Sequence, residues 1–198
     1  MRRVDPVKHE EKRREILDAA GRCFARKGFQ GATISGICSE AKISPGHLYH
    51  YFTSKEEIVE AMAAAGLASG MELFRRIIEG PDVLAAFVAE IERVKTRHIA
   101  GQALLMDMLA ESGRNPTMGK ILQEHSRAVI ALLAGFLRTG QSRGQIDPGL
   151  DPDLAACSLL SVFDGAKTLA IRDQNIDKLK SYDVLKILII RFLTPPTP

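Results

Sequence analysis

Residues 33–55 contain two helix-start signals separated by a short turn, and this stretch constrains the fold of the 198-residue chain most strongly. Thr33 stands directly before Ile34, where its hydroxyl can cap a first short helix. Ser44 followed by Pro45 marks the start of a second helix, because the Ser hydroxyl can accept a bond from an unpaired amide and Pro needs no N–H partner there. We therefore predict two short helices joined by a tight turn.

The second short helix has polar and aromatic side chains on its outer face. Leu48 and Phe52 lie four residues apart and share the buried side. Two Tyr and two His residues occupy the remaining directions, which suits contacts with phosphates and base edges better than a protein core. We expect the hydroxyl, phenol and ammonium groups to hold phosphates, and Gly46, His47 and His50 to lie nearest the bases. The predicted DNA-binding residues are Thr33, Lys42, Ser44, Pro45, Gly46, His47, Tyr49, His50, Tyr51 and Lys55.

This stretch resembles the TetR family of bacterial transcription regulators, and the resemblance covers about the first 65 residues. The matching positions are Thr33, Ile37, Ala41, Ser44-Pro45-Gly46, Leu48-Tyr49-His50-Tyr51-Phe52 and Ser54-Lys55-Glu56-Glu57-Ile58. A weaker likeness to BetI-type members lies around Ala110-Glu111 and Arg114-Asn115-Pro116. The resemblance implies dimerisation through the last two long helices. It also implies a small-molecule pocket between the long helix after the motif and the helices that follow it.

The turn between the two short helices departs from the family pattern at one position. The family often has Gly where Lys42 stands. A left-handed backbone at Lys42 would cost about 1 kcal/mol, which a Lys close to DNA phosphates would offset. Gly36 also weakens the first short helix, by roughly 1 kcal/mol relative to Ala.

Apolar residues recur with a helical period along the remaining chain, so we predict an all-α fold of about nine helices. Three helices would form an N-terminal head and six a C-terminal body. Ser54 and Glu57 form a capping box at the start of a long helix that begins at residue 54. Gly66 and Gly70 lie within this helix and either permit a bend or allow close packing against another helix. Besides the two short helices, the expected helices span residues 8–27, 54–79, 82–98, 102–112, 115–139, 154–172 and 180–193.

The charges of the chain are distributed unevenly between these two parts. Residues 1–55 hold 11 Lys and Arg against 6 Asp and Glu, whereas residues 56–198 hold 16 against 18. A basic head on a slightly acidic body suits a protein whose head alone meets a polyanion. We predict a helix-turn-helix DNA-binding domain over residues 1–53 and an effector-binding and dimerisation domain over residues 54–198.

Asp107 is an unexpected charge inside the apolar run from Leu104 to Leu109. Either it faces solvent from a half-buried helix or it lines an interior cavity. Met and Phe residues of the body would wall such a pocket, because Met adapts to irregular space, although ordinary core packing is the alternative for each of them. An apolar or a cationic effector would fit this set. The predicted ligand-binding residues are Met62, Met71, Phe74, Phe87, Ile91, Met106, Asp107, Met108 and Phe163.

The last helix, from Val184 to Leu193, has apolar residues on more than one stripe, and the helix before it is similarly rich. A surface helix of a monomer needs only one apolar stripe, so a two-fold four-helix interface is expected, with full enclosure in a core as the alternative. The predicted dimer-interface residues are Leu159, Val162, Phe163, Leu185, Leu188, Ile189 and Phe192.

Several function classes find little support in the sequence. No catalytic constellation, cofactor motif or metal-ligand spacing is present, so we expect neither an enzyme nor a cofactor. Cys23, Cys38 and Cys157 lack paired spacing and are expected to be buried thiols in a reducing cytoplasm. The N-terminus lacks the apolar core of a signal peptide, and no run is long enough to span a membrane.

These observations favour a ligand-responsive, dimeric transcription repressor that leaves a palindromic operator when a small molecule binds. Two-fold symmetry implies half-sites about one helical turn apart, or a multiple of it. The alternatives are a transcription activator of the same family and a DNA-binding protein without an effector. A small helical enzyme is a third reading. Salt-sensitive DNA binding that a ligand abolishes would distinguish the ligand-responsive repressor from the DNA-binding protein without an effector and from the enzyme.

Overall fold

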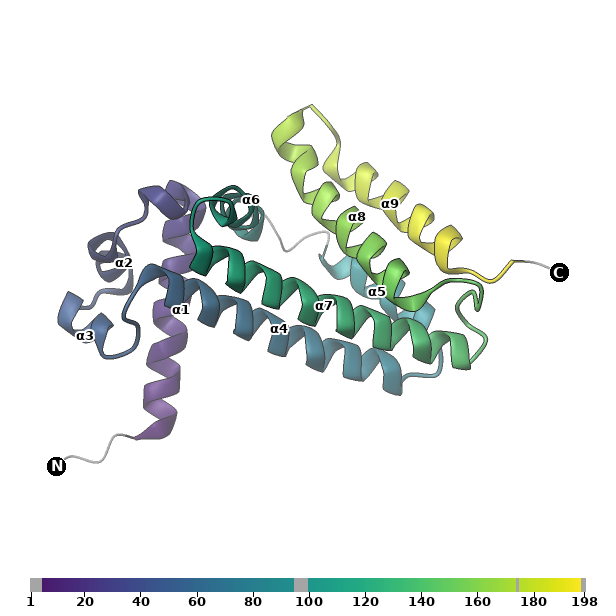
Figure 1. The fold of residues 1–198 in the computed structure, drawn as a ribbon, viewed down its shortest axis with the longest axis horizontal. Coiled ribbons are helices and arrows are strands. Elements are labelled where there is room, and N and C mark those ends of the chain that lie inside the picture. The colour runs from purple at the N-terminus through teal and green to yellow at the C-terminus, as the bar shows by residue number, and fades with distance from the viewer. Residues whose placement is uncertain (1–4, 95–99, 174, 197–198) are drawn as a thin grey trace. The chain divides into compact units, whose positions relative to one another are not determined.

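The structure, a computed structural model, describes residues 5–94, 100–173 and 175–196. In these residues the chain forms nine α-helices and no strand, which confirms the predicted fold class. Figure 1 shows their order along the chain. The helices are α1 (Pro6–Gly31), α2 (Ile34–Ala41), α3 (Pro45–Tyr49), α4 (Lys55–Glu79), α5 (Val83–Val94), α6 (Ala100–Ser112), α7 (Pro116–Ser142), α8 (Pro152–Arg172) and α9 (Lys178–Leu193).

The chain divides into two compact units that cut across α4 and α7. Unit 1 comprises residues 1–66 and 99–124, and unit 2 comprises residues 67–98 and 125–198. Unit 1 therefore contains α1, α2, α3, α6 and the N-terminal parts of α4 and α7. The predicted functional division after Thr53 does not coincide with this compact division, because α6 packs on α1 and joins the head in one core.

The helix starts agree with the capping signals in the sequence. Ser54 accepts a hydrogen bond from the Glu57 amide at 3.1 Å, and the Glu57 carboxylate accepts one from the Thr53 amide at 2.6 Å. This reciprocal pair is the expected capping box, with the carboxylate reaching one residue further back. The bonds from Thr53 hold the pKa of Glu57 below its ordinary value. The predicted end of the fifth helix, at His98, lies outside the described residues.

Unit 1 is built around apolar side chains contributed by all of its helices. Phe24, Leu48 and Phe52 are almost completely buried, and Met108 of α6 and Met118 of α7 belong to the same cluster. Burial of such side chains is the main force that holds short helices in place, since helices of five to eight residues are marginal on their own. The short helices α2 and α3 therefore depend on the longer ones.

Glu40 of α2 joins that short helix to α1. Its carboxylate accepts a hydrogen bond from Arg22 at 2.8 Å and another from Arg26. These two guanidinium groups hold the pKa of the Glu40 carboxyl at about 2, compared with an ordinary value of 4.5. The ionised carboxylate is thus favoured by the folded state.

We expect Glu40→Gln to destabilise the protein at neutral pH but not in strong acid. Because the folded pKa is depressed, the contribution of Glu40 is present above about pH 4.5 and is lost as the pH falls towards about 2. Thermal unfolding followed by circular dichroism between pH 2 and pH 7 measures this difference. A gap in melting temperature between the two proteins that is independent of pH would contradict the role of Glu40.

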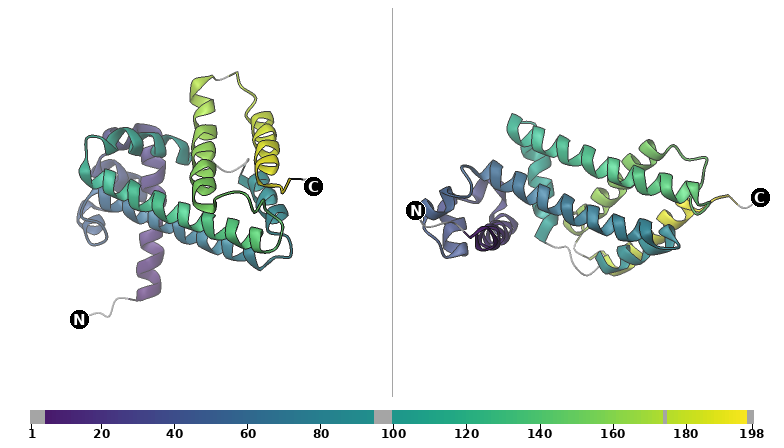
Figure 2. Two further views of the ribbon diagram at one scale, coloured as in Figure 1. Left: turned by 45° about the vertical axis from the view of Figure 1, so that its right-hand side comes forward. Right: turned by 90° about the horizontal axis from the view of Figure 1, so that it is seen from below.

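Unit 2 holds the second core, formed by α5, α8, α9 and the C-terminal parts of α4 and α7. Phe136, Leu159 and Ile189 are fully buried in it. Figures 1 and 2 both show α8 and α9 running side by side, and α9 also packs on α5. An ion pair between Lys186 of α9 and Glu92 of α5 adds to this packing. Among the described residues, none of the helices has the length and apolarity needed to traverse a membrane.

Candidate functional site

The second short helix, α3, forms as its sequence predicts. The Ser44 hydroxyl accepts a hydrogen bond from the His47 amide at 3.2 Å, and Pro45 occupies the first helical position. Leu48 and Phe52 are buried in the core of unit 1. Two local signals, the cap and the apolar pair, therefore decide which face of α3 points outward.

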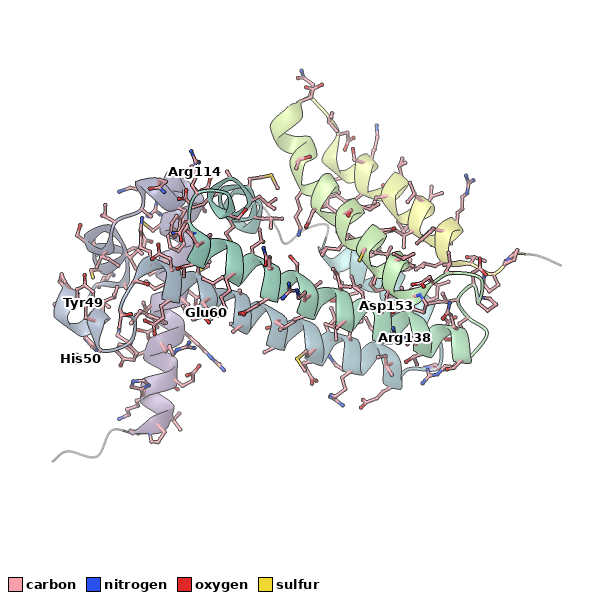
Figure 3. All side chains as sticks on the ribbon, viewed as in Figure 1. Tyr49, His50, Glu60, Arg114, Arg138 and Asp153 are labelled. Carbon is pink, nitrogen blue, oxygen red and sulfur yellow. The ribbon has the colours of Figure 1, made fainter. Side chains whose placement is uncertain are left out.

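The outward face of α3 carries the predicted base-reading side chains. His47, Tyr49 and His50 are exposed, and Tyr49 retains 54% of its accessible surface. Figure 3 shows Tyr49 and His50 projecting from α3 away from the core of unit 1. Tyr51 is only half-buried, and its ring stacks on that of His9 with centroids 4.5 Å apart. An exposed set of imidazole and phenol groups on a capped helix suits hydrogen bonding to DNA.

The turn before α3 places a non-glycine residue in a left-handed conformation. Lys42 has φ 54° and ψ 46° and ends α2, where its amide donates to the carbonyls of Cys38 and Ser39. Its side chain is exposed, close in sequence to the α3 start. Thr33 caps the other end of α2 by accepting a bond from the Gly36 amide at 3.1 Å. Both ends of α2 thus behave as predicted.

Lys42→Gly is expected to have opposite effects on stability and on DNA affinity. Glycine adopts the left-handed conformation without strain, so the free energy of unfolding should rise by about 1 kcal/mol. Loss of a phosphate contact should weaken binding to all DNA sequences and reduce the salt slope by about one unit. Urea denaturation and a salt titration of DNA affinity measure the two effects. Unchanged affinity would remove Lys42 from the interface.

Lys55, predicted to hold a phosphate, instead binds two carbonyl groups within unit 1. Its ammonium donates to the carbonyl oxygens of Phe29 at 2.8 Å and Ala32 at 2.9 Å. The ammonium also lies 4.5 Å from the centroid of the Phe29 ring, in cation–π range. Two of its three N–H bonds are therefore committed to the end of α1. The structure thus gives Lys55 a role in holding α4 to the end of α1, and its predicted contact with a phosphate stays a prediction.

Asp107 also has a structural partner at the end of α1. Its carboxylate accepts a hydrogen bond from the Phe29 amide at 2.8 Å. Gly28 makes this approach possible, because it has a φ of 69° and a β-carbon there would lie 2.8 Å from an Asp107 oxygen. Asp107 is half-buried, so part of its side chain faces solvent, as in the first of the two readings, and its place in a ligand pocket stays a prediction. The position of Asp107 in an apolar run indicated a special role for this residue but did not identify Phe29 as its partner.

The remaining predicted ligand residues divide between the two units. Met62 and Met108 pack with the core of unit 1, whereas Met71 is 56% exposed on α4 and Met106 is half-buried on α6. Four further predicted residues share the core of unit 2, and they are Phe74, Phe87, Ile91 and Phe163.

Phe87 stands at the centre of an aromatic cluster in unit 2. Its ring centroid lies 4.6 Å from that of Phe136, 5.9 Å from that of Phe74 and 6.2 Å from that of Phe163. These rings come from α4, α5, α7 and α8. Phe136 was not among the predicted residues, although it follows the same apolar face of α7 as Val129.

Three polar side chains that sequence reasoning missed lie on α7 and α8. Lys167 binds Asp164 at 2.8 Å in a half-buried pair. Burial and the charge of Lys167 lower the pKa of His125, which favours the neutral imidazole. Lys167 lies four residues after Phe163, on the same helical face. A charge continuing an apolar stripe was the signal that would have identified it.

The predicted dimer-interface residues fall into two groups. Leu159 and Ile189 are 1% and 0% exposed within the protomer, and Phe163 and Phe192 are half-buried against the same core. The apolar excess of α8 and α9 thus partly fills the core of unit 2. Leu159 and Ile189 are therefore corrected to core residues, which leave no surface for a partner.

The outer faces of α8 and α9 retain an open apolar groove of about 260 Å³. Val184 and Leu188 are 65% and 51% exposed there, and Leu154 on α8 is 69% exposed. An exposed apolar patch of this kind is typical of an interaction surface. Val162, Leu185 and Leu188 are the predicted interface residues in this groove. Its lining is formed by Val162, Gly165, Ala166, Ser181, Tyr182, Val184, Leu185 and Leu188.

The cysteine prediction is correct for two residues and wrong for the third. Cys23 and Cys38 are buried, and burial raises the pKa of the Cys38 thiol. Cys157 is exposed, because it faces outward from α8 rather than towards the core. Within the described part of the chain, His, Cys, Asp and Glu residues do not gather in groups of three or more that would suit a metal ion.

The two-helix motif, its exposed recognition helix and the all-helical body define a helix-turn-helix DNA-binding regulator. Comparison with known proteins agrees with this class. The profile of bacterial regulatory proteins of the tetR family matches residues 16–62, and that of the BetI-type transcriptional repressor C-terminal region matches residues 82–188. The transcriptional regulator UidR of Escherichia coli is 31% identical over 153 residues, covering 77% of this chain and 78% of UidR.

Solved structures show the same fold. GusR of Salmonella enterica has a TM-score of 0.75 and 29% identity, covering 92% of this chain and 95% of GusR. FadR of Bacillus subtilis in complex with stearoyl-CoA has a TM-score of 0.74 and 22% identity, covering 90% of this chain and 97% of FadR. The chain belongs to the TetR family of bacterial transcription regulators, which bind operator DNA, act as dimers and respond to small molecules.

Proposed function

We propose that this protein is a repressor that binds a palindromic operator as a homodimer and leaves it when an effector binds in unit 2. The observation that carries the proposal is α3, whose apolar residues are buried while His47, Tyr49 and His50 are exposed. One such helix in each subunit would enter successive major grooves of one duplex face. The likeness of residues 82–188 to the BetI-type repressors supports repression rather than activation.

In this proposal the base edges are read by His47 and His50, with Gly46 allowing close approach. Thr33, Lys42, Ser44, Tyr49 and Tyr51 lie on the surrounding surface and hold phosphates. Contacts to bases determine sequence preference, whereas contacts to phosphates determine register and overall affinity. The protein acts by binding, in the bacterial cytoplasm, and none of its residues is assigned a catalytic role.

We place the effector beside the aromatic cluster around Phe87. FadR was solved with stearoyl-CoA, which has a long apolar chain. An apolar body would pack against Phe87 and Phe163, and a polar end would reach His125 and the Lys167–Asp164 pair. The cationic alternative rested on Asp107, whose carboxylate is bound to the Phe29 amide. Neutral His125 offers both a donor and an acceptor, so it suits a polar end group with hydroxyl or carbonyl functions.

The structure suggests a route by which unit 2 can influence the head. Helices α4 and α7 each continue from unit 1 into unit 2. Within unit 1, α4 contacts the end of α1 through Lys55, and α6 contacts it through Asp107. An effector shifts the equilibrium only by its difference in affinity for the two arrangements, typically about 1–3 kcal/mol, and operator DNA weakens effector binding by the same factor.

Binding-site selection followed by an anisotropy titration tests the proposal. Selected DNA should contain an inverted repeat whose half-sites are about one helical turn apart, or a multiple of it, and its affinity should fall steeply with salt. Small molecules that raise the melting temperature should then release the operator, and Phe87→Ala should abolish that release without weakening DNA binding. Stabilising ligands that leave DNA binding unchanged would favour an effector-independent DNA-binding protein. No selected sequence would favour a helical enzyme.

A further inference from the structure

The first three turns of α1 extend beyond the core of unit 1. The first buried residue of α1 is Ile16, and residues 5–11 are all exposed. Figure 1 shows this part of α1 continuing past α2 and α3 towards the N-terminus. This part of α1 has no apolar face packed on the core, so other contacts must stabilise its helical structure.

Local contacts along α1 account for part of that order. Asp5 caps the helix by accepting a bond from the Val7 amide at 3.1 Å. Lys12 and Glu15 form an ion pair at 2.6 Å. Such exposed interactions contribute only a few tenths of a kcal/mol to about 1 kcal/mol each. They stabilise the helix but do not direct it towards any other part of the unit.

Two ring contacts join α1 to the segment just after α3. The His9 ring stacks on Tyr51, with centroids 4.5 Å apart and an interplanar angle of 27°. One turn later, the Arg13 guanidinium lies 5.3 Å from the centroid of the Phe52 ring. Tyr51 also neighbours His47 of α3, with centroids 5.6 Å apart. The Tyr51 ring is therefore flanked by imidazoles from two helices.

We propose that His9 is a positioning residue of the DNA-binding surface, which holds the Tyr51 ring in the orientation that binds a phosphate. This role rests on the proposed contact between Tyr51 and DNA. The Tyr51 backbone is fixed by its amide, which donates to the Leu48 carbonyl at 2.8 Å. Its side chain is only half-buried, so the core alone does not determine the ring orientation. The stack on His9 supplies that constraint and lowers the entropy lost when DNA binds.

The role predicts a distinct response to two substitutions at one position. His9→Ala removes the ring and should weaken binding to operator and random DNA alike, by about three- to tenfold, the range expected for one aromatic pair. His9→Phe retains a stacking ring but lacks the imidazole N–H groups, and it should restore affinity. Val7→Ala is the matched control, because Val7 is 66% exposed in the same part of α1. It should leave affinity unchanged.

A double-mutant cycle with Tyr51→Ala tests whether His9 acts through Tyr51. His9→Ala should have no further effect once the Tyr51 ring is absent. Thermal unfolding should be nearly the same in the His9 variants, because His9 is exposed, whereas Tyr51 packs against the core of unit 1 and Tyr51→Ala should lower the melting temperature. Proton NMR should show the ring-current shift of Tyr51 lost in His9→Ala and retained in His9→Phe.

Three outcomes would overturn the proposal. They are an unchanged affinity in His9→Ala, a His9→Phe variant as weak as His9→Ala, and additive effects of the two substitutions in the cycle. Additive effects would mean that His9 contacts DNA directly and not through Tyr51. Tyr51→Ala tests the proposed function separately: if that variant binds DNA normally, the phosphate contact of Tyr51 is wrong, whereas a weaker Tyr51→Ala with a normal His9→Ala rejects only the role of His9.

Discussion

Replacing Lys55 by methionine is expected to lower the free energy of unfolding by about 2–3 kcal/mol and to leave the salt dependence of DNA affinity unchanged. The ammonium donates to the Phe29 and Ala32 carbonyls, and hydrogen bonds to a charged group are among the stronger ones. Methionine keeps much of the side-chain volume but leaves both carbonyls without this donor. Since Lys55 is half-buried and binds two protein carbonyls, its loss should affect folding first.

Urea denaturation and a salt titration of DNA affinity separate the two roles considered for Lys55. Lys120→Met is the matched control, because Lys120 is exposed on α7 of the same unit and pairs only loosely with Glu124, at 3.8 Å. That variant should unfold like the parent protein. If Lys55→Met is as stable as the parent and its salt slope falls by about one unit, Lys55 is a phosphate ligand after all.

Asp107→Ala should destabilise the same region, by about 1–3 kcal/mol, because the Phe29 amide loses its acceptor. Asp107 binds the amide of Phe29, and Lys55 binds its carbonyl. Combining Asp107→Ala with Lys55→Met should therefore lower the free energy of unfolding by less than the sum of the two single effects. Such sub-additivity would indicate that the two side chains stabilise the same segment at the end of α1. Strict additivity in urea denaturation would indicate two independent contacts.

The second large effect is expected at the groove on α8 and α9. Leu188→Glu places a charge on a 51% exposed apolar position, so it should disrupt a self-complementary interface while sparing the protomer core. A monomer engages only one half-site, and the loss of the linked second site should weaken operator binding by about 10²- to 10⁴-fold. Light scattering and an operator titration measure both consequences.

Met71→Glu serves as the control for Leu188→Glu. Met71 is 56% exposed on α4, outside the groove, and the variant should remain a dimer with normal affinity. Ile189→Glu should behave differently from both, because Ile189 is fully buried and a charge there should prevent folding. A folded dimeric Leu188→Glu variant would show that the groove is not the dimer interface.

The sequence by itself determined the local structure of the DNA-binding head. The Ser44 and Thr33 caps and the buried pair Leu48 and Phe52 were all predictable, whereas the left-handed backbone of Lys42 was raised only through the resemblance to a family that often has Gly there. Each depends on groups two to four residues apart, and helix geometry sets their distances once the helix exists. The exposed face of α3, and with it the candidate DNA-reading residues, followed directly from the same spacing.

Only the tertiary structure decided which partners the isolated charges found. Lys55 and Phe29 are 26 residues apart, Asp107 and Phe29 are 78 apart, and a periodic pattern carries no information about such pairs. The same holds for His9 on Tyr51. On α9, the pattern marked Leu188 and Ile189 equally as apolar, yet one is exposed and the other is buried. The docking of α9 on α5 and α8 makes that choice, since a helix with apolar residues on several stripes can pack by any of them.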